Sequence, residues 1–360
     1  MKRLLALDGG GIRGVLSLQI LARIEAILRE KAGNPNLVIA DHFDYLAGTS
    51  TGAIIASCLA WGMTVKQVQE LYLGHAAEMF RPAPVYRRFW NKFQAEAITN
   101  MFKKIFSEDG HGKNPAPLGT KKLRTLLTLV MRNNSTGSPW PVSNNPAAKF
   151  NDPALPGCNL NLPLWQLVRA STAAPVYFPP ETIDLGGREQ VFVDGGITPY
   201  NNPALLLYLM ATLPSYNLVW KTGVNELLLV SVGTGRVRTG AGQMQVKKMN
   251  LLYNVSAIPS ALMESICVQQ DVICRTIGLC KAGEEIDSEI GDLRNVPPGE
   301  RESRKFTYLR YDHCFTSEEI DTAVKETKSG FDLDNLRLIP LLQSIGSRYA
   351  EEHVRSEDLA

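Results

Sequence analysis

The chain has 360 residues, of which 44% are hydrophobic and 21% charged, a composition typical of a globular protein with a sizeable core. Its 38 basic and 36 acidic residues leave a net charge of +2, so charge gives no reason to expect a nucleic acid polymer as partner. No run approaches the ~18 apolar residues of a spanning helix, and the N-terminal apolar run is too short for a signal peptide, so we expect a cytoplasmic protein whose contact with a membrane is peripheral.

The first sixty residues predict alternating strands and helices. Short apolar runs at 4–7 and 43–47 each end in a glycine-rich turn, and helical periodicity follows each of them, at 15–31 and 51–61. This βαβα order predicts an α/β fold with a parallel sheet.

The rest of the chain continues the mixed pattern. Helices are expected at 64–80, 94–106, 119–131, 162–173, 202–213, 246–280 and 335–353, and strands at 190–193, 227–232 and 305–311. The range 81–161 is rich in Pro, Gly and Asn and is interpreted as a variable, lid-like helical insertion over the sheet. We predict one domain over 1–360, with the core motifs in 3–240 and C-terminal helices and a late strand in 241–360.

The six cysteines and five histidines are dispersed, without C-x-x-C or H-x-x-x-H spacing. This distribution favours reduced, mostly buried thiols. We predict no metal and no cofactor.

Three glycine-rich turns each follow an apolar run. They are Asp8-Gly9-Gly10-Gly11-Ile12-Arg13-Gly14, Gly48-Thr49-Ser50-Thr51-Gly52 and Asp194-Gly195-Gly196. Turns that follow the strands of a parallel sheet lie at its carboxyl edge, where α/β folds place their sites. We therefore expect all three to meet in space.

The middle turn is typical of a nucleophile elbow. A serine on a sharp strand-to-helix turn exposes its hydroxyl, and small residues two positions before and after it let the strand and helix approach. Ser50 would be the nucleophile and Asp194 its base. A capping serine and a plain D-G-G turn are the alternatives for the two motifs taken separately. A triad completed by His313 is a further alternative.

The first turn offers consecutive backbone N–H groups without side chains, which suits an oxyanion hole. Gly10 and Gly11 are the expected donors, and Gly9 shapes the loop. Arg13 would orient the loop, attract an anionic headgroup or form a surface salt bridge. The turn also matches G-x-G-x-x-G through Gly9, Gly11 and Gly14, but no acidic residue follows at the position that a dinucleotide site requires.

In order and spacing, these motifs resemble the patatin-like phospholipase family, whose pattern is D-G-G-G-x-R-G, then G-x-S-x-G, then D-G-G or D-G-A. Ala170–Pro175, Tyr177–Pro180 and Leu229–Gly235 extend the resemblance. It implies a three-layer α/β/α fold with a mostly parallel sheet, and a metal-free serine acyl-hydrolase acting on membrane phospholipids through a Ser50–Asp194 dyad. The implied oxyanion hole is Gly9, Gly10 and Gly11, and the supporting motif residues are Asp8, Arg13, Gly14, Gly48, Gly52, Gly195 and Gly196.

A narrower resemblance is to family members of CBASS anti-phage systems, which a cyclic nucleotide switches on. The Trp140–Asn145 stretch is similar. It implies a cyclic di- or trinucleotide activator, with candidate contacts at Arg87, Arg88, Lys103 and Lys104, and leaves a homo-oligomer open. The basic and aromatic residues of 85–106 suit either a bilayer interface or a lid with its aromatics packed inward. A non-catalytic storage or binding protein on the same scaffold is the alternative function.

Overall fold

The computed structural model describes residues 1–79, 93, 95–237, 251–295, 297, 299–328 and 330–359, with the backbone alone for residues 79 and 251–260. Within these residues the core is a nine-stranded sheet of order β5-β6-β3-β2-β1-β7-β10-β9, with β4 also paired to β3. Its strands are β1 (Lys2–Leu7), β2 (Tyr45–Thr49), β3 (Leu126–Asn133), β4 (Ser138–Ser143), β5 (Glu181–Asp184), β6 (Glu189–Asp194), β7 (Leu227–Val232), β9 (Leu279–Ala282) and β10 (Thr307–Tyr311). The short strands β8 (Arg236–Val237) and β11 (Cys314–Phe315) form a second sheet.

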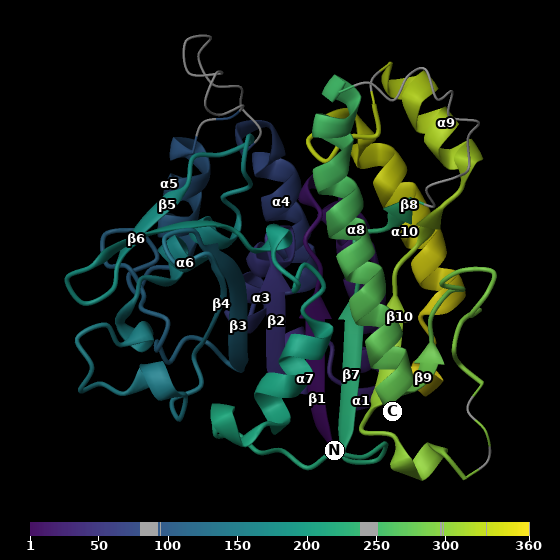
Figure 1. Ribbon diagram of the computed structural model, residues 1–360, viewed down its shortest axis with the longest axis horizontal. Helices are drawn as coiled ribbons and strands as arrows, with labels where there is room; N and C mark the ends of the chain where they lie inside the picture. Colours follow the sequence, from purple (N-terminus) through teal and green to yellow (C-terminus); the bar gives the residue numbers. More distant parts are fainter. Residues whose placement is uncertain are drawn as a thin grey trace.

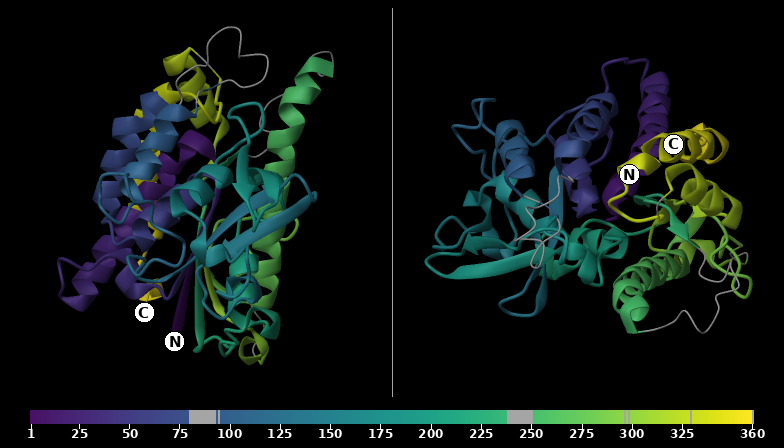
Figure 2. Two further views of the ribbon diagram at one scale, coloured as in Figure 1. Left: turned by 90° about the vertical axis from the view of Figure 1, so that its left-hand side faces the viewer. Right: turned by 90° about the horizontal axis from the view of Figure 1, so that it is seen from above.

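Helices cover both faces of the large sheet (Figures 1 and 2). They are α1 (Gly14–Ala32), α2 (Ile39–His42), α3 (Thr51–Ala60), α4 (Val65–Met79), α5 (Glu96–Ile105), α6 (Leu164–Ser171), α7 (Ala204–Thr212), α8 (Leu251–Ile277), α9 (Ser317–Thr327) and α10 (Ile339–His353).

Alternate residues of the central strands belong to two separate hydrophobic clusters. In β1, Leu5 and Leu7 join the cluster that contains α1, α3, α4 and α10, whereas Leu4 and Ala6 join the cluster that contains α7 and the end of α8. Successive strand residues point to opposite faces of a sheet, so the sheet lies between two helical layers. The predicted three-layer fold is confirmed, and the side view in Figure 2 shows the green α8 on one side and the purple and yellow helices on the other.

The middle of the sheet is parallel and one end is antiparallel. β1 pairs in parallel with β2 and β7, and β10 pairs in parallel with β7 and β9. β4 and β6, in contrast, run antiparallel to β3. The expected mostly parallel sheet is therefore present, with an antiparallel extension at β3.

The ends of β2 and β6 meet along one edge of β3. β4 pairs with residues 128–133 of β3, so it occupies one edge, and β2 and β6 must share the other, at 126–130 and 131–133 respectively. β2 ends opposite Val130 of β3, and β6, which runs in the opposite direction, ends opposite Met131. The D-G-G turn thus reaches the end of β2 because its strand is antiparallel, and the expectation that it follows a parallel strand was wrong.

The range 81–161 differs most from the sequence-based expectation. The helix expected at 119–131 is wrong, because β3 begins at Leu126 and is a central strand of the sheet. β4 was not expected either, and neither were β5, β9 and α9. Since β3 and β4 belong to the sheet itself, that part of 81–161 is not an elaboration over it.

The aromatic residues of 85–106 that the structure describes point inward. Phe93, Phe102 and Phe106 are buried, and Phe93 packs against Tyr177 and Phe178. Residues 85–92, including Arg87 and Arg88, lie outside the described residues. Within the described part, the packing of these rings fits a cover over the core and not a bilayer-facing surface. Among the helices of the described chain, none combines the length and apolarity that crossing a bilayer requires.

Candidate active site

Ser50 lies at the turn between β2 and α3 in a strained backbone conformation. Its φ of 55° and ψ of −123° fall in a region that side-chain-bearing residues seldom adopt. The turn brings the hydroxyl beside the N-terminus of α3, whose dipole favours developing negative charge. This is the geometry of a nucleophile elbow.

Gly48 and Gly52 permit the elbow because the backbone is packed against them. A Cβ on Gly48 would lie 2.1 Å from the carbonyl oxygen of Gly52, and one on Gly52 would lie 2.2 Å from that of Leu7. These are backbone atoms of neighbouring elements and cannot rotate away, so both positions require glycine.

We expect Gly52→Ala to destabilise the protein by roughly 1–3 kcal/mol, as overpacked sites do. An alanine in a helix normally gains about 1 kcal/mol over glycine, but the contact with Leu7 outweighs this gain. Gly74→Ala in α4 is the matched control, because nothing lies within 4 Å of its Cβ. Urea unfolding of both variants measures the difference, and equal or greater stability of Gly52→Ala would contradict the packing argument.

The Asp194 carboxylate faces Ser50. The Ser50 hydroxyl donates to Asp194 Oδ2 at 2.6 Å, and the Gly196 N–H donates to Oδ1 at 2.7 Å. Burial raises the pKa of Asp194 from 3.8 to about 6, although the hydrogen bonds from Ser50 and Gly196 and the charge of Arg169 oppose the rise. A carboxylate with a raised pKa that contacts a serine hydroxyl can act as a general base near neutral pH.

The end of α6 holds both members of this pair. Ser171 Oγ accepts the N–H of Ser50 at 3.0 Å and donates to the Val130 carbonyl at 2.6 Å, while the Ala173 carbonyl accepts the N–H of Asp194 at 3.0 Å. Arg169 is 1% exposed, and two of its nitrogens have no hydrogen-bond partner among the described residues. The stretch Ala170–Pro175 contributes to the family resemblance in sequence, but its spacing did not predict that it would hold Ser50 and Asp194.

The glycine-rich loop after β1 lies against the same serine. A Cβ on Gly9 would come within 3.2 Å of the Ser50 Cβ. The N–H of Gly9 donates to the Asn201 carbonyl at 3.1 Å, so Gly9 shapes the loop and its N–H is not available to an oxyanion. The Gly9 carbonyl accepts from Thr234 Oγ1 at 3.2 Å.

The next two amides of the loop, those of Gly10 and Gly11, are not engaged in this way in the described part of the chain. The Gly11 carbonyl accepts hydroxyl groups of Thr51 at 2.9 Å and Tyr72 at 2.6 Å, which fixes the peptide planes of the loop. No partner for the N–H of Gly10 or Gly11 occurs among the residues that the structure describes. Gly11 also has a φ of 57°, which favours glycine. The loop therefore offers two backbone donors beside Ser50.

Asp8 anchors this loop to the sheet. Its carboxylate accepts two hydrogen bonds from Arg310, at 3.1 and 2.6 Å, and Arg310 also contacts Asp312 and Ser231. Burial alone would lower the pKa of Arg310, but the charges of Asp312 and Asp8 raise it well above its usual value. Asp8 thus has a structural role, and Arg310, which sequence reasoning did not identify, is its partner.

The remaining motif residues support the turns. Cβ atoms on Gly14 and Gly195 would meet Thr51 Cγ2 at 2.6 Å and the Val130 carbonyl oxygen at 2.3 Å. The Gly196 N–H donates to the Asp194 side chain, which caps the short helical turn that follows it, and Arg13 lines a cavity of about 390 Å³ whose wall includes Gly9 and Met263 of α8. Ser50 does not line this cavity, but Gly9, which packs against Ser50, does.

His313 does not complete a triad. Its Nε2 lies 2.9 Å from Glu319 and its Nδ1 lies 3.8 Å from Glu284, so both ring nitrogens face carboxylates of other elements. Among the described residues, no group of three or more His, Cys, Asp or Glu side chains could hold a metal ion.

The fold and this site define an α/β protein with a serine–carboxylate pair at a strand–turn–helix elbow. The profile of the family described as patatin-like phospholipase matches residues 5–208. The chain belongs to this family. Membership leaves the dinucleotide-binding alternative without support.

The chain is similar in sequence or structure to several characterised proteins. The chain is 32% identical over 215 residues to a cGAMP-activated phospholipase of Vibrio cholerae, covering 57% of this chain and 56% of that protein. It is 26% identical to Patatin-17 of Solanum cardiophyllum, covering 65% of this chain and 61% of the relative. Human GIVD cytosolic phospholipase A2 is similar with a TM-score of 0.45 and 11% identity, covering 99% of this chain and 60% of that one. The chain thus spans less than two thirds of the length of these relatives.

Proposed function

We propose that the chain is a serine acyl-hydrolase that releases fatty acids from membrane phospholipids. The observation that carries this proposal is the 2.6 Å hydrogen bond from Ser50 to a buried Asp194, beside a loop with two unengaged N–H groups. Family membership supports the same chemistry.

In the proposed mechanism Asp194 Oδ2 takes the hydroxyl proton as Ser50 Oγ attacks the ester carbonyl carbon. The oxyanion accepts hydrogen bonds from Gly10 and Gly11. Collapse breaks the ester bond, Asp194 returns the proton to the leaving alcohol of the lysophospholipid, and the fatty acyl group stays on Ser50. Asp194 then takes a proton from water, the resulting hydroxide releases the fatty acid, and the proton returns to Ser50.

The alternative is a storage or binding protein on the same scaffold, and active-site labelling distinguishes the two. A fluorophosphonate probe reacts only with an activated serine, so we expect it to label the wild-type chain. Peptide mapping should place the label on Ser50. An unlabelled wild-type chain that still binds phospholipid vesicles would favour the alternative.

We also propose that a cyclic nucleotide switches the hydrolase on, on the strength of the similarity to the cGAMP-activated phospholipase. Of the contacts considered from sequence, the Lys103 ammonium lies over the Trp165 ring at 4.6 Å. This contact holds the half-buried Lys103 against α6.

We expect one member of a panel of cyclic di- and trinucleotides to raise fatty-acid release by about 5–150-fold, the range of ordinary allosteric coupling. The measurement is release from vesicles of defined phospholipids, with linear nucleotides as controls. Equal rates of fatty-acid release with every nucleotide would contradict the proposed activation and leave the proposed hydrolase activity unaffected.

A further inference from the structure

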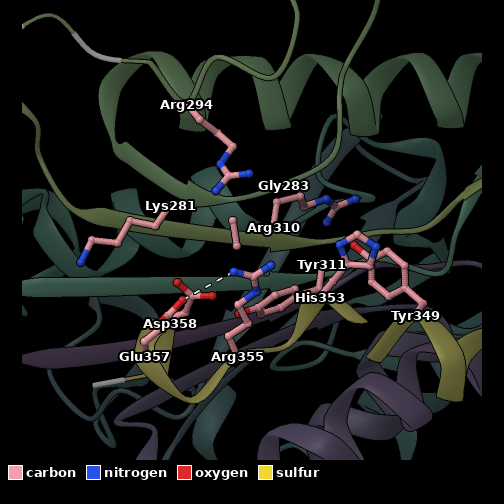
Figure 3. A pocket seen from close by; sticks show the side chains of 11 residues that line it. Lys281, Gly283, Arg294, Arg310, Tyr311, Tyr349, His353, Arg355, Glu357 and Asp358 are labelled. Carbon is pink, nitrogen blue, oxygen red and sulfur yellow. Dashed lines mark ion pairs between the residues drawn. The ribbon is translucent and has the colours of Figure 1, made fainter. Parts of the chain in front are cut away.

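A second cavity lies away from Ser50, where β9, β10 and the C-terminal end of α10 come together (Figure 3). It has a volume of about 110 Å³, which is room for about four water-sized groups. That volume can accommodate a phosphoryl group. All of its lining residues lie between 281 and 358, outside the range 5–208 that the family profile matches.

Basic side chains line this cavity. Lys281, Arg294 and Arg355 line it, and His353 lines it from the end of α10. Figure 3 shows Arg294 and Arg355 extending toward one another from opposite sides, whereas the Lys281 side chain extends away from both. All four side chains are exposed, so an anion can reach them from solvent.

The buried wall of the cavity carries a free hydroxyl. Tyr311 is 1% exposed, and its hydroxyl has no hydrogen-bond partner among the described residues. Burial raises the pKa of Tyr311, so the hydroxyl keeps its proton and remains a donor. A buried polar group without a partner is costly, and a ligand acceptor would satisfy it.

Two carboxylates reduce the positive charge of the cavity without cancelling it. Glu357 lies 3.7 Å from Arg355, and Asp358 also lines the cavity. Burial and the charge of Glu357 raise the pKa of Asp358. The charge of Arg310 is taken up elsewhere by Asp8 and Asp312, so the lining carries three basic side chains, Lys281, Arg294 and Arg355, and two carboxylates.

We propose that this cavity is a binding site for a phosphoryl group, held by Arg294 and Arg355 with a hydrogen bond from the Tyr311 hydroxyl. Guanidinium groups bind phosphate oxygens through paired, charge-assisted hydrogen bonds. The phosphoryl group can come from free phosphate, a nucleotide or a lipid headgroup. Assigning it to the activator rests on the proposed switch, whereas the binding site itself does not.

The test is binding of inorganic phosphate to the full chain, measured by calorimetry at constant ionic strength with chloride as the reference anion. We expect Arg294→Gln with Arg355→Gln to weaken binding by at least about tenfold and Asp358→Asn to strengthen it. Lys66→Gln, on the exposed face of α4, is the matched control and should leave binding unchanged. Unchanged phosphate affinity in the double variant, with its melting temperature retained, would overturn the site.

Two competition experiments identify the source of the phosphoryl group. Cyclic GMP–AMP that competes with phosphate in the wild-type chain supports a nucleotide ligand, and vesicles of anionic phospholipid that compete support a headgroup. If neither competes, phosphate itself is the ligand. Because the readout is binding, it remains valid if the chain proves to have no hydrolase activity.

Discussion

Ser50→Ala is expected to reduce fatty-acid release from phospholipid vesicles by on the order of 10⁴-fold or more, as loss of a catalytic nucleophile does. The fold should persist, because the strained turn is held by Gly48, Gly52 and the hydrogen bond from the Ser50 N–H to Ser171, none of which needs the hydroxyl. Release is measured as free fatty acid per mole of protein, and folding as the melting temperature.

Asp194→Asn is the second variant of this test. Its expected gain in stability separates a loss of catalysis from a loss of folding. An acid whose folded pKa of about 6 exceeds its ordinary 3.8 binds more protons when folded, so it lowers stability as pH rises from about 4 to 6. Asparagine removes that cost, which is at most about 3 kcal/mol. We expect a variant without activity that is more stable than wild type at pH 7.5, with the gain fading near pH 4.

The control for both variants is Ser265→Ala, which removes an exposed hydroxyl whose hydrogen-bond partner among the described residues is the Ala261 carbonyl of its own helix. It should retain full activity. If Ser50→Ala or Asp194→Asn kept wild-type activity, the assignment of the dyad would be wrong.

The site residues that the sequence predicted are those that lie in a short glycine-rich turn. Ser50 was identifiable because Gly48 and Gly52 flank it in a pattern that only a tight strand–helix turn requires. Asp194 and the loop at Gly10 and Gly11 follow from the same reasoning. In each case the glycines and the functional residue lie within a few positions of one another, so spacing carries the signal.

The parts that sequence did not predict depend on contacts between distant segments. The run Leu127–Met131 is buried on both faces of the sheet, and without alternation its periodicity does not distinguish a strand from a helix. β4 contains Pro139 and Pro141, which normally argue against a strand. It tolerates them because it pairs only with β3, as an edge strand can.

The interactions of charged side chains could not be predicted from local sequence either. Nothing in the sequence connects Arg310 to Asp8 or Arg169 to Asp194, because each pair is joined only when β10 or α6 packs beside the glycine turns. The direction of β6 is also a tertiary property, set by its pairing with β3. Local motifs thus predicted the groups that we propose to react, whereas the charged groups around them could be found only from the fold.

The second large effect expected is on the pH dependence of catalysis. The base must be ionised to accept the Ser50 proton, and burial raises the pKa of Asp194 to about 6. The rate constant kcat/KM should therefore be nearly constant above about pH 7 and fall about tenfold for each unit of pH well below 6. A profile that stays flat down to pH 4 would contradict Asp194 as the base.

Arg169 should determine where that fall begins. Its charge opposes the burial that raises the pKa of Asp194, so Arg169→Met should move the acid limb to higher pH while Ser50 stays labelled by fluorophosphonate at alkaline pH. Arg169→Lys keeps the charge and should restore part of the wild-type profile. Arg348→Met, which removes an exposed arginine paired with Glu319, should leave the limb in place. A purely structural role for Arg169 would lower kcat at every pH without moving the limb, and that outcome would exclude electrostatic tuning of Asp194.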